Sequence, residues 1–267
     1  MSKKLIALDL DGTTLNNDST ISPKTAQILQ KVRANGHVVS IATGRPYRMS
    51  AHYYQQLHLD SPIVNFNGAL IHKPQQKWAY EKEYSIQREI AFEILAQKEK
   101  LHLDFVAAEN RETFFIDNLQ NFQKDFFATD TVTDANLFSQ LKTNPTSVML
   151  KTKNEFSNFV VKTLTNQFSD EIEVRTWGGP NAILEVVPKG VQKAMAVSVV
   201  AESMQIKQKD VIAFGDEHND VELLDYAGWG VAMKNGTEQV KKVANDITDK
   251  TNDEDGMVDY LEELLAM

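Results

Sequence analysis

Leu5-Ile6-Ala7-Leu8 runs directly into Asp9-Leu10-Asp11-Gly12-Thr13 near the start of this 267-residue chain. The apolar run at 5–8 predicts a strand that is buried on both faces of a parallel sheet. In open α/β sheets, ligands bind beyond the carboxyl ends of the strands, where these two carboxylates lie. Two positions apart on extended backbone, Asp9 and Asp11 point to the same side. Taken alone, the segment is also consistent with a strand and a simple Asp-Gly turn.

Strand and helix signals alternate after this segment. Ser22-Pro23 predicts a helix start, because serine caps a helix and proline fits its first position. Asn35-Gly36 predicts the end of that helix. Apolar runs at 38–42 and 63–66 predict two more buried strands. Strands that alternate with helices of this length predict right-handed crossovers and a doubly wound α/β fold.

The same pattern returns near the C-terminus, with helices predicted at 194–204 and 257–265 and strands at 211–214 and 229–233. The sequence between these two portions has a different pattern of apolar and polar residues.

Residues 101–106 and 183–186 alternate apolar and polar side chains, which predicts half-exposed antiparallel strands. We therefore expect a core domain made of residues 1–81 and 188–267, and an inserted α+β domain at 82–187.

Composition excludes several kinds of function. The net charge of −9 opposes binding to a nucleic acid, which needs a basic surface. The chain has no cysteine, which excludes disulfides, thiolate nucleophiles and cysteine-based metal sites. Asp9 interrupts the first apolar run before it reaches the length of a signal peptide, and no run reaches the roughly 18 apolar residues of a membrane span. We expect a cytoplasmic protein with no nucleic-acid or membrane partner.

Two more predicted strand ends carry polar residues. Thr43-Gly44-Arg45 follows the second strand and precedes a predicted helix, so its hydroxyl and amides are candidates for an anion site. The alternative is a capping threonine beside a loop glycine. Asn67, after the third strand, is a candidate substrate contact or a residue that stabilises its own turn. Arg45 is a second candidate for a substrate contact, and the loop 177–181 (Trp-Gly-Gly-Pro-Asn) is a third.

A second acidic segment, Gly215-Asp216-Glu217-His218-Asn219-Asp220, follows the strand predicted at 211–214. Asp216 and Asp220 would share a face if a helix began here. Carboxylates at a strand end suit Mg²⁺, although an acidic helix N-terminus is favourable without a metal. Lys193 lies at the start of the helix that precedes the strand predicted at 211–214. Only this position distinguishes it from lysines on the protein surface.

Together these residues resemble the haloacid dehalogenase superfamily, and specifically its Cof-type phosphatases. Each motif of that family has a counterpart in the same order. The counterparts are residues 9–13, Thr43-Gly44-Arg45, Lys193, and residues 215–220, with 230–235 and 254–256 as further matches. The resemblance covers essentially the whole chain. It implies a Rossmann-like core and makes the inserted domain a large cap that selects the substrate.

The resemblance also implies residue roles. Asp9 is expected to be the nucleophile that forms an aspartyl-phosphate, and Asp11 the general acid and then the general base. The expected Mg²⁺ ligands are Asp9, the backbone carbonyl of Asp11, and Asp216, with Asp220 as a ligand or a support. The expected phosphate-binding residues are Leu10, Thr43, Gly44, Lys193 and Asn219. The implied activity is Mg²⁺-dependent hydrolysis of small phosphate monoesters, such as sugar phosphates or phosphorylated cofactors, by a monomer or small homo-oligomer.

The chain departs from the family pattern at Ala194 and Gly236, where glycine and alanine are usual. Neither change removes a functional group, so we expect altered packing and not lost activity.

Alternatives come from within and outside the superfamily. Phosphomutases also keep both aspartates, but they typically carry a small helical cap, whereas strands are predicted here. A non-catalytic sensor of phosphorylated metabolites would be expected to lose Asp9, Asp11, Lys193 or Asp216, and this chain keeps all four. Rossmann-type dinucleotide binding is excluded, because no Gly-x-Gly-x-x-Gly follows the first strand.

Overall fold

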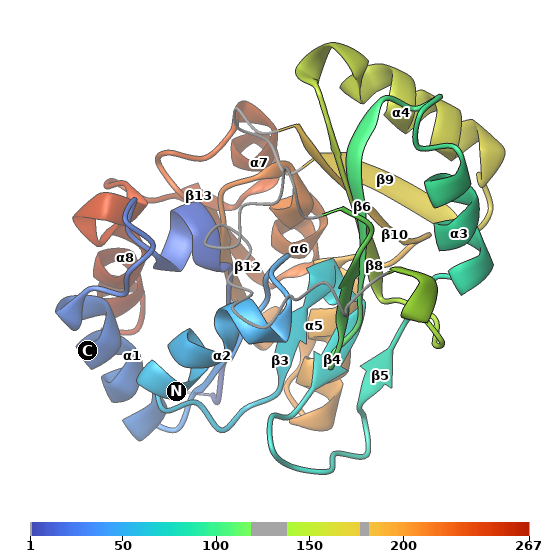
Figure 1. The fold of residues 1–267 in the computed structure, drawn as a ribbon. Helices are drawn as coiled ribbons and strands as arrows, with labels where there is room; N and C mark the ends of the chain where they lie inside the picture. Colours follow the sequence, from blue (N-terminus) through green and yellow to red (C-terminus); the bar gives the residue numbers. More distant parts are fainter. Residues whose placement is uncertain (1, 119–137, 177–181, 267) are drawn as a thin grey trace. The chain divides into compact units, whose positions relative to one another are not determined.

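The computed structural model describes residues 2–118, 138–176 and 182–266. The chain forms two compact units, shown in Figure 1. The first comprises Met1–Lys82 and Gln192–Met267, and the second Glu83–Val191. The second unit extends past the expected end at residue 187 because the chain there still bonds to it: the Lys189 amide donates to Glu171, and Arg175 donates to the Val191 carbonyl.

The first unit is built on a parallel sheet of five strands in the order β13-β12-β11-β1-β2. These strands are β1 (Leu5–Leu8), β2 (Val38–Ile41), β11 (Val211–Gly215), β12 (Trp229–Ala232) and β13 (Asp246–Ile247). A parallel bridge between Ala42 and Val64 joins β2 to a second sheet of three strands. That sheet contains β3 (Ile63–Asn65), β4 (Leu70–His72) and β5 (Lys82–Glu83).

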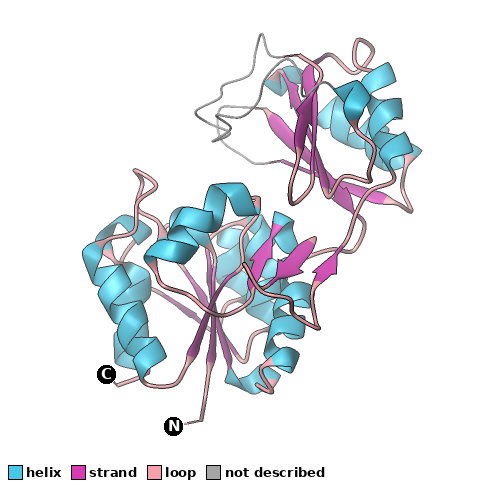
Figure 2. Ribbon diagram, turned by 60° about the horizontal axis from the view of Figure 1, so that its bottom comes forward, coloured by secondary structure: helices cyan, strands magenta, loops and turns pink. Residues whose placement is uncertain are grey.

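Helices cover both faces of the parallel sheet (Figure 2). The helices α1 (Pro23–Ala34), α2 (Tyr47–Gln56) and α8 (Gly256–Leu264) contribute to one apolar cluster with the sheet. The helices α5 (Lys193–Ser203), α6 (Val221–Tyr226) and α7 (Glu238–Val243) lie on the other side (Figure 1). The fold class predicted from the alternating strand and helix signals is therefore confirmed.

Local signals fix where the elements begin and end. The Ser22 side chain accepts a hydrogen bond from the Thr25 amide and caps α1, with Pro23 in the first position, as predicted. Strand register then brings distant segments together. Leu8 of β1 pairs with Phe214 of β11 on one side and with Ile41 of β2 on the other. The residues that follow these three strands therefore emerge at the same edge of the sheet.

The second unit is an antiparallel sheet in the order β7-β6-β8-β10-β9, with helices on one face. Its strands are β6 (Leu103–Glu109), β7 (Phe114–Ile116), β8 (Ser147–Thr152), β9 (Ile172–Thr176) and β10 (Ile183–Pro188). The helices α3 (Arg88–Ala96) and α4 (Asn154–Gln167) share one apolar cluster with the sheet. Along the described ranges of the chain, no helix combines the length and the apolar character that crossing a membrane requires.

The expectation of half-exposed strands is wrong for 183–186 and holds only in part for 101–106, where His102 is exposed and Asp104 is half-buried. β6 and β10 are antiparallel, as predicted, but they are interior strands and almost all of their side chains are buried. Val106 and Leu184 face the helices, whereas Phe105 and Ile183 belong to a second apolar cluster. Alternation in the sequence indicates two different faces, and it does not show that one of them meets solvent.

Candidate active site

The site lies at the edge of the parallel sheet where β1, β2 and β11 end. Asp9 follows β1 directly, and Asp216 follows β11. The chain turns sharply at Gly12, whose φ of 69° lies in the left-handed region that suits glycine. A side chain at Gly12 would also collide with Asp216, because a Cβ there would lie 2.2 Å from its Oδ2. Glycine is therefore required for the Asp9 loop to reach Asp216.

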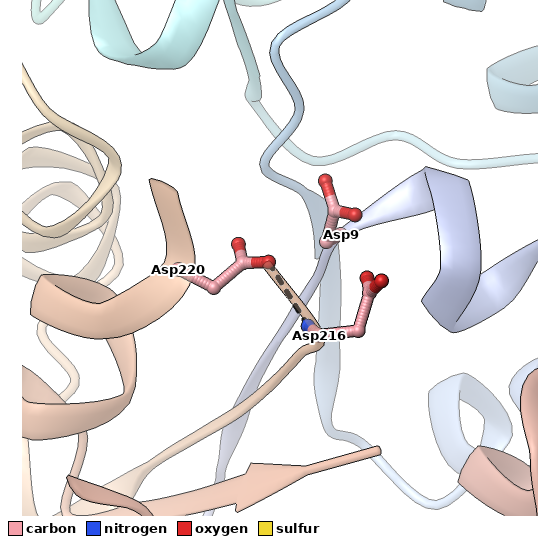
Figure 3. Close-up of side chains that lie close together, drawn as sticks. All are labelled: Asp9, Asp216 and Asp220. Atoms are coloured by element: carbon pink, nitrogen blue, oxygen red, sulfur yellow. Dashed lines mark hydrogen bonds between the residues drawn. The ribbon is translucent and has the colours of Figure 1, made fainter. Parts of the chain in front are cut away.

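Three buried carboxylates gather at this edge (Figure 3). Asp9, Asp216 and Asp220 each offer one oxygen, and these oxygens lie within 4.8 Å of one another. Among the described residues they form a group that could hold a metal ion. Oxygen ligands from carboxylates suit Mg²⁺, and a cation would offset the repulsion among three negative charges.

Lys193, the first residue of α5, is fully buried beside these carboxylates. Its Nζ lies 2.6 Å from Oδ1 of Asp9 and 2.7 Å from Oδ1 of Asp220. These two carboxylates raise the pKa of the Lys193 ammonium despite the opposing effect of burial, so the lysine keeps its charge. Lys193, the lysine that its position in the sequence distinguishes, therefore contacts Asp9, the proposed nucleophile.

Burial and mutual repulsion also raise the pKa of Asp9 and Asp216, which favours the neutral form of these carboxylates. Burial raises the pKa of Asp9 well above its usual value, with Lys193 opposing the rise and Asp220 adding to it. Burial and then Asp220 raise the pKa of Asp216 to about 7. Clustered carboxylates that resist ionisation are typical of sites that bind a cation.

Asp220 organises the loop after β11. Its Oδ2 accepts the backbone amides of Asp216 and Glu217 at 3.0 and 3.2 Å, and the first of these bonds is drawn in Figure 3. No α-helix spans both aspartates: a 3-10 turn covers His218–Asp220, and α6 begins at Val221. The two carboxylates are therefore brought together by this loop and not by a shared helix face. His218 is exposed and contacts the Glu217 carboxylate.

Asp11 is held by Arg45. Nε and Nη2 of Arg45 donate to Oδ2 and Oδ1 of Asp11 at 2.7 and 2.5 Å, a bidentate ion pair. The Arg45 guanidinium also lies over the Tyr53 ring, 5.5 Å from its centroid. Asp11 remains more than half exposed at its side chain, unlike Asp9. Arg45, a candidate substrate contact from the sequence, thus contacts the candidate acid/base residue in this structure.

The candidate phosphate-binding residues line the same edge. The Thr43 hydroxyl accepts the Arg45 amide at 3.1 Å, and Nδ2 of Asn219 donates to Oδ1 of Asn67 at 2.9 Å. A Cβ on Gly44 would lie 3.1 Å from both polar atoms of the Asn67 side chain. The Leu10 side chain is buried in the apolar cluster under the sheet, so only its backbone is available to a ligand.

Three residues at the site were given no role from the sequence. Thr13 donates to Oδ1 of Asp216 at 2.9 Å, and Thr14 donates to the Asp9 carbonyl at 2.5 Å. Nδ2 of Asn235 donates to the Gly12 carbonyl at 2.8 Å, so a C-terminal loop supports the turn after Asp9. For Thr13 and Thr14, the sequence signal that could have indicated a role is their position directly after Asp11-Gly12. The loop 177–181, a candidate substrate contact, lies outside the described residues.

Comparisons with known proteins show the family of this chain. Residues 6–261 match the family model described as haloacid dehalogenase-like hydrolase. The chain is 37% identical to the Bacillus subtilis 5-amino-6-(5-phospho-D-ribitylamino)uracil phosphatase YitU over 98% of both chains. It is 29% identical to a second B. subtilis protein with that activity in its name, YcsE, over 95% of this chain and 92% of the relative.

A solved structure from the same family has a similar fold. A haloacid dehalogenase-like hydrolase from Bacteroides thetaiotaomicron has a TM-score of 0.88 at 27% identity, with 98% of this chain and all of the other covered.

Proposed function

Because this chain belongs to the haloacid dehalogenase-like hydrolase family and is a phosphoric monoester hydrolase, we propose that it removes phosphate from small molecules through an aspartyl-phosphate on Asp9. The observation that carries this mechanism is the buried contact between Lys193 and Asp9 inside a cluster of three carboxylates. A carboxylate nucleophile beside a fixed cation suits phosphoryl transfer, in which charge spreads over three phosphoryl oxygens.

The residues present fit a Mg²⁺ ion. Asp9, Asp216 and the Asp11 carbonyl are the proposed ligands. Asp220 is better suited to a supporting role, because Lys193 occupies its Oδ1 and two backbone amides occupy its Oδ2. When bound, Mg²⁺ would neutralise negative charge on the phosphoryl group.

The two aspartates near β1 have different surroundings and therefore different proposed roles. Lys193 holds Oδ1 of Asp9, which leaves Oδ2 as the oxygen for attack on phosphorus. Asp11 is more exposed and would protonate the leaving alcohol, then take a proton from the hydrolytic water. Arg45 donates to both oxygens of Asp11 and so fixes the orientation of this carboxyl group.

Polar groups from four segments of the chain would bind the phosphoryl group. Lys193, the Thr43 hydroxyl, the Asn219 amide, and the backbone at Leu10 and Gly44 are the proposed donors. Asn67 orients Asn219 by accepting from its Nδ2, which gives Asn67 a place next to the substrate.

We propose 5-amino-6-(5-phospho-D-ribitylamino)uracil as the first substrate to test. The support is the name of the B. subtilis relative that is 37% identical over nearly the full length of both chains. The unit Glu83–Val191 is the proposed cap that selects the leaving group. The monomeric or small oligomeric state expected from the sequence stays a prediction.

Hydrolysis of 4-nitrophenyl phosphate with and without Mg²⁺ tests the mechanism. We expect activity only with the metal, and none in Asp9→Asn. Full activity without metal, or in Asp9→Asn, would overturn the mechanism. A panel of phosphate esters ranked by kcat/KM tests the substrate, and the proposal requires 5-amino-6-(5-phospho-D-ribitylamino)uracil to rank at or near the top. Release of inorganic phosphate, and not of an isomeric ester, separates hydrolysis from a mutase reaction.

A further inference from the structure

Three fully buried polar side chains form a cluster beside the active site. They are Ser50 in α2, Asn65 at the end of β3, and His72 at the end of β4. Nδ2 of Asn65 lies 2.9 Å from the Arg45 carbonyl oxygen and 2.9 Å from the Ser50 hydroxyl. Nε2 of His72 lies 3.1 Å from Oδ1 of Asn65. The cluster therefore ends on the backbone of the residue that holds Asp11.

The chemistry of the partners fixes the direction of each bond. The Arg45 carbonyl can only accept, so the group that faces it must be the NH₂ end of Asn65. Oδ1 of Asn65 is then an acceptor, and Nε2 of His72 must carry the hydrogen. The Ser50 hydroxyl accepts from Asn65 and donates to the carbonyl of Pro46, the residue just before α2. His72, Asn65 and Arg45 are thus connected in one direction, from donor to acceptor.

Arg45 needs this support because of its place in the chain. It lies in the loop between β2 and α2, outside both elements. Its carbonyl receives one long backbone bond, 3.3 Å, from the Phe66 amide, and the Asn65 side chain supplies the shorter one. When its carbonyl is fixed in this way, the Arg45 guanidinium points toward both oxygens of Asp11.

We propose that Asn65, oriented by His72, is a positioning residue that sets the Arg45 backbone and through it the geometry of Asp11. This inference rests on the proposed function, in which Asp11 protonates the leaving group. His72 bonds to Asn65, and Asn65 bonds to the Arg45 carbonyl, so the proposed effect of both residues passes through Arg45. Buried hydrogen bonds of fixed direction favour one arrangement of the chain, because the groups that they join lie away from water.

The role predicts a defect in a single chemical step. Displacement of Asp11 weakens protonation of the leaving group, and this protonation matters most for a poor leaving group. Phenyl phosphate and 4-nitrophenyl phosphate have nearly the same shape, but phenolate is the poorer leaving group. The ratio of their kcat/KM values reports the step that forms the aspartyl-phosphate, and it is independent of how much of the preparation is folded.

The experiment measures this ratio in the full chain with Mg²⁺. Asp11→Asn calibrates it and should lower kcat/KM for phenyl phosphate far more than for 4-nitrophenyl phosphate. Asn65→Leu, which keeps the size but cannot donate, should shift the ratio the same way by about tenfold. His72→Phe should shift it less, and His72→Gln, which restores a donor, should bring it back toward wild type.

Two further variants separate positioning from simple destabilisation. Ser40→Ala removes a buried hydroxyl that donates to the Pro62 carbonyl, away from Arg45, and should leave the ratio unchanged. The double variant Asn65→Leu/Arg45→Ala should have the same ratio as Arg45→Ala alone. Asn65 is proposed to act on Asp11 only through Arg45, so its loss should have no further effect once the Arg45 side chain is removed.

The outcomes distinguish the inference from the function on which it rests. If Asn65→Leu lowers both rates equally while Asp11→Asn shifts the ratio, the inference is wrong and the proposed mechanism stands. If Asp11→Asn itself leaves the ratio unchanged, Asp11 is not the general acid and the proposed mechanism fails at that point. An additive effect of Asn65→Leu on Arg45→Ala would also overturn the inference.

Discussion

The ammonium nitrogen of Lys193 lies 2.6 Å from Oδ1 of Asp9, and solvent does not reach the lysine side chain. The contact joins the first residue of α5 to the residue after β1, which are 184 positions apart in the sequence. It provides the only positive charge that the described residues place in ion-pair contact with Asp9 or Asp220. Both the chemistry and the stability of the site should therefore depend on it.

Replacing Lys193 by methionine should abolish phosphatase activity and destabilise the protein. The change leaves Asp9 and Asp220 buried without their cation, and breaking a buried ion pair typically costs about 3–5 kcal/mol. Added Mg²⁺ should restore part of this stability. Urea unfolding with and without Mg²⁺ measures both effects. Lys189→Met, at an exposed lysine that precedes the same helix, is the control and should change neither activity nor stability. Wild-type activity and stability in Lys193→Met would contradict the role proposed for Lys193.

Replacing Asp9 by asparagine should separate activity from stability. Loss of the proposed nucleophile should reduce kcat on the order of 10³-fold or more. Because burial raises the pKa of Asp9, its ionised form is unfavourable in the fold, and the neutral amide should raise the melting temperature of the metal-free protein at pH 8. Lys193 keeps its contact with Asp220 in this variant. Thermal unfolding in EDTA checks the rise, and a lower melting temperature would show that the Lys193 contact outweighs the burial of charge.

Metal-free protein should become less stable as the pH rises toward neutrality. The pKa of Asp216 is about 7 in the folded protein, above its usual 3.8, so the folded state holds a proton that the unfolded state releases. The resulting stabilisation is complete below about pH 4 and is lost as the pH rises through about 7, by up to about 1.4 kcal/mol per pH unit.

The difference in unfolding free energy between wild type and Asp216→Asn, measured in EDTA from pH 5 to 8, reports the titration of Asp216 together with its effect on the pKa of Asp9. We expect wild type to lose stability relative to Asp216→Asn across this range, and Mg²⁺ to reduce the loss. A pH-independent difference would rule out a raised pKa at Asp216.

Replacing Gly12 by alanine should weaken metal binding. The new Cβ would lie 2.2 Å from Oδ2 of Asp216 and must displace that carboxylate. Disturbed support of a metal ligand typically lowers affinity about 10–100-fold. Gly36→Ala is the matched control, because Gly36 also has a positive φ but a Cβ there would meet nothing within 4 Å. The Mg²⁺ dependence of activity should shift in Gly12→Ala and stay at the wild-type value in Gly36→Ala.

Much of the core could be predicted from the sequence because its signals are local. Buried strands appear as apolar runs, as at 5–8, and the start of α1 is marked by Ser22 and Pro23. The exposure of β6 and β10 could not be predicted, because it depends on what packs against each face of the sheet. A sequence of alternating residues carries no information about that covering layer.

The site was partly predictable for the same reason. Motif residues such as Asp9 and Asp216 follow strands, so their approach could be inferred once the strands were assigned. The pairing of Asp11 with Arg45, and the support of Arg45 by Asn65, depend on side-chain directions across segments that are distant in the chain. These contacts have no local signature in the sequence.

The strand order of the parallel sheet has a consequence for the protein during its synthesis. β1 lies between β2, which is made soon after it, and β11, which is made near the end. Thr13 and Asp216 bond across 203 positions, a delay of about 10–40 s at roughly 5–20 residues per second on the ribosome. A nascent chain that stops before β11 holds Asp9, the proposed nucleophile, but lacks Asp216 and Asp220. Phosphatase activity should therefore appear only once β11 and the loop after it have left the ribosome.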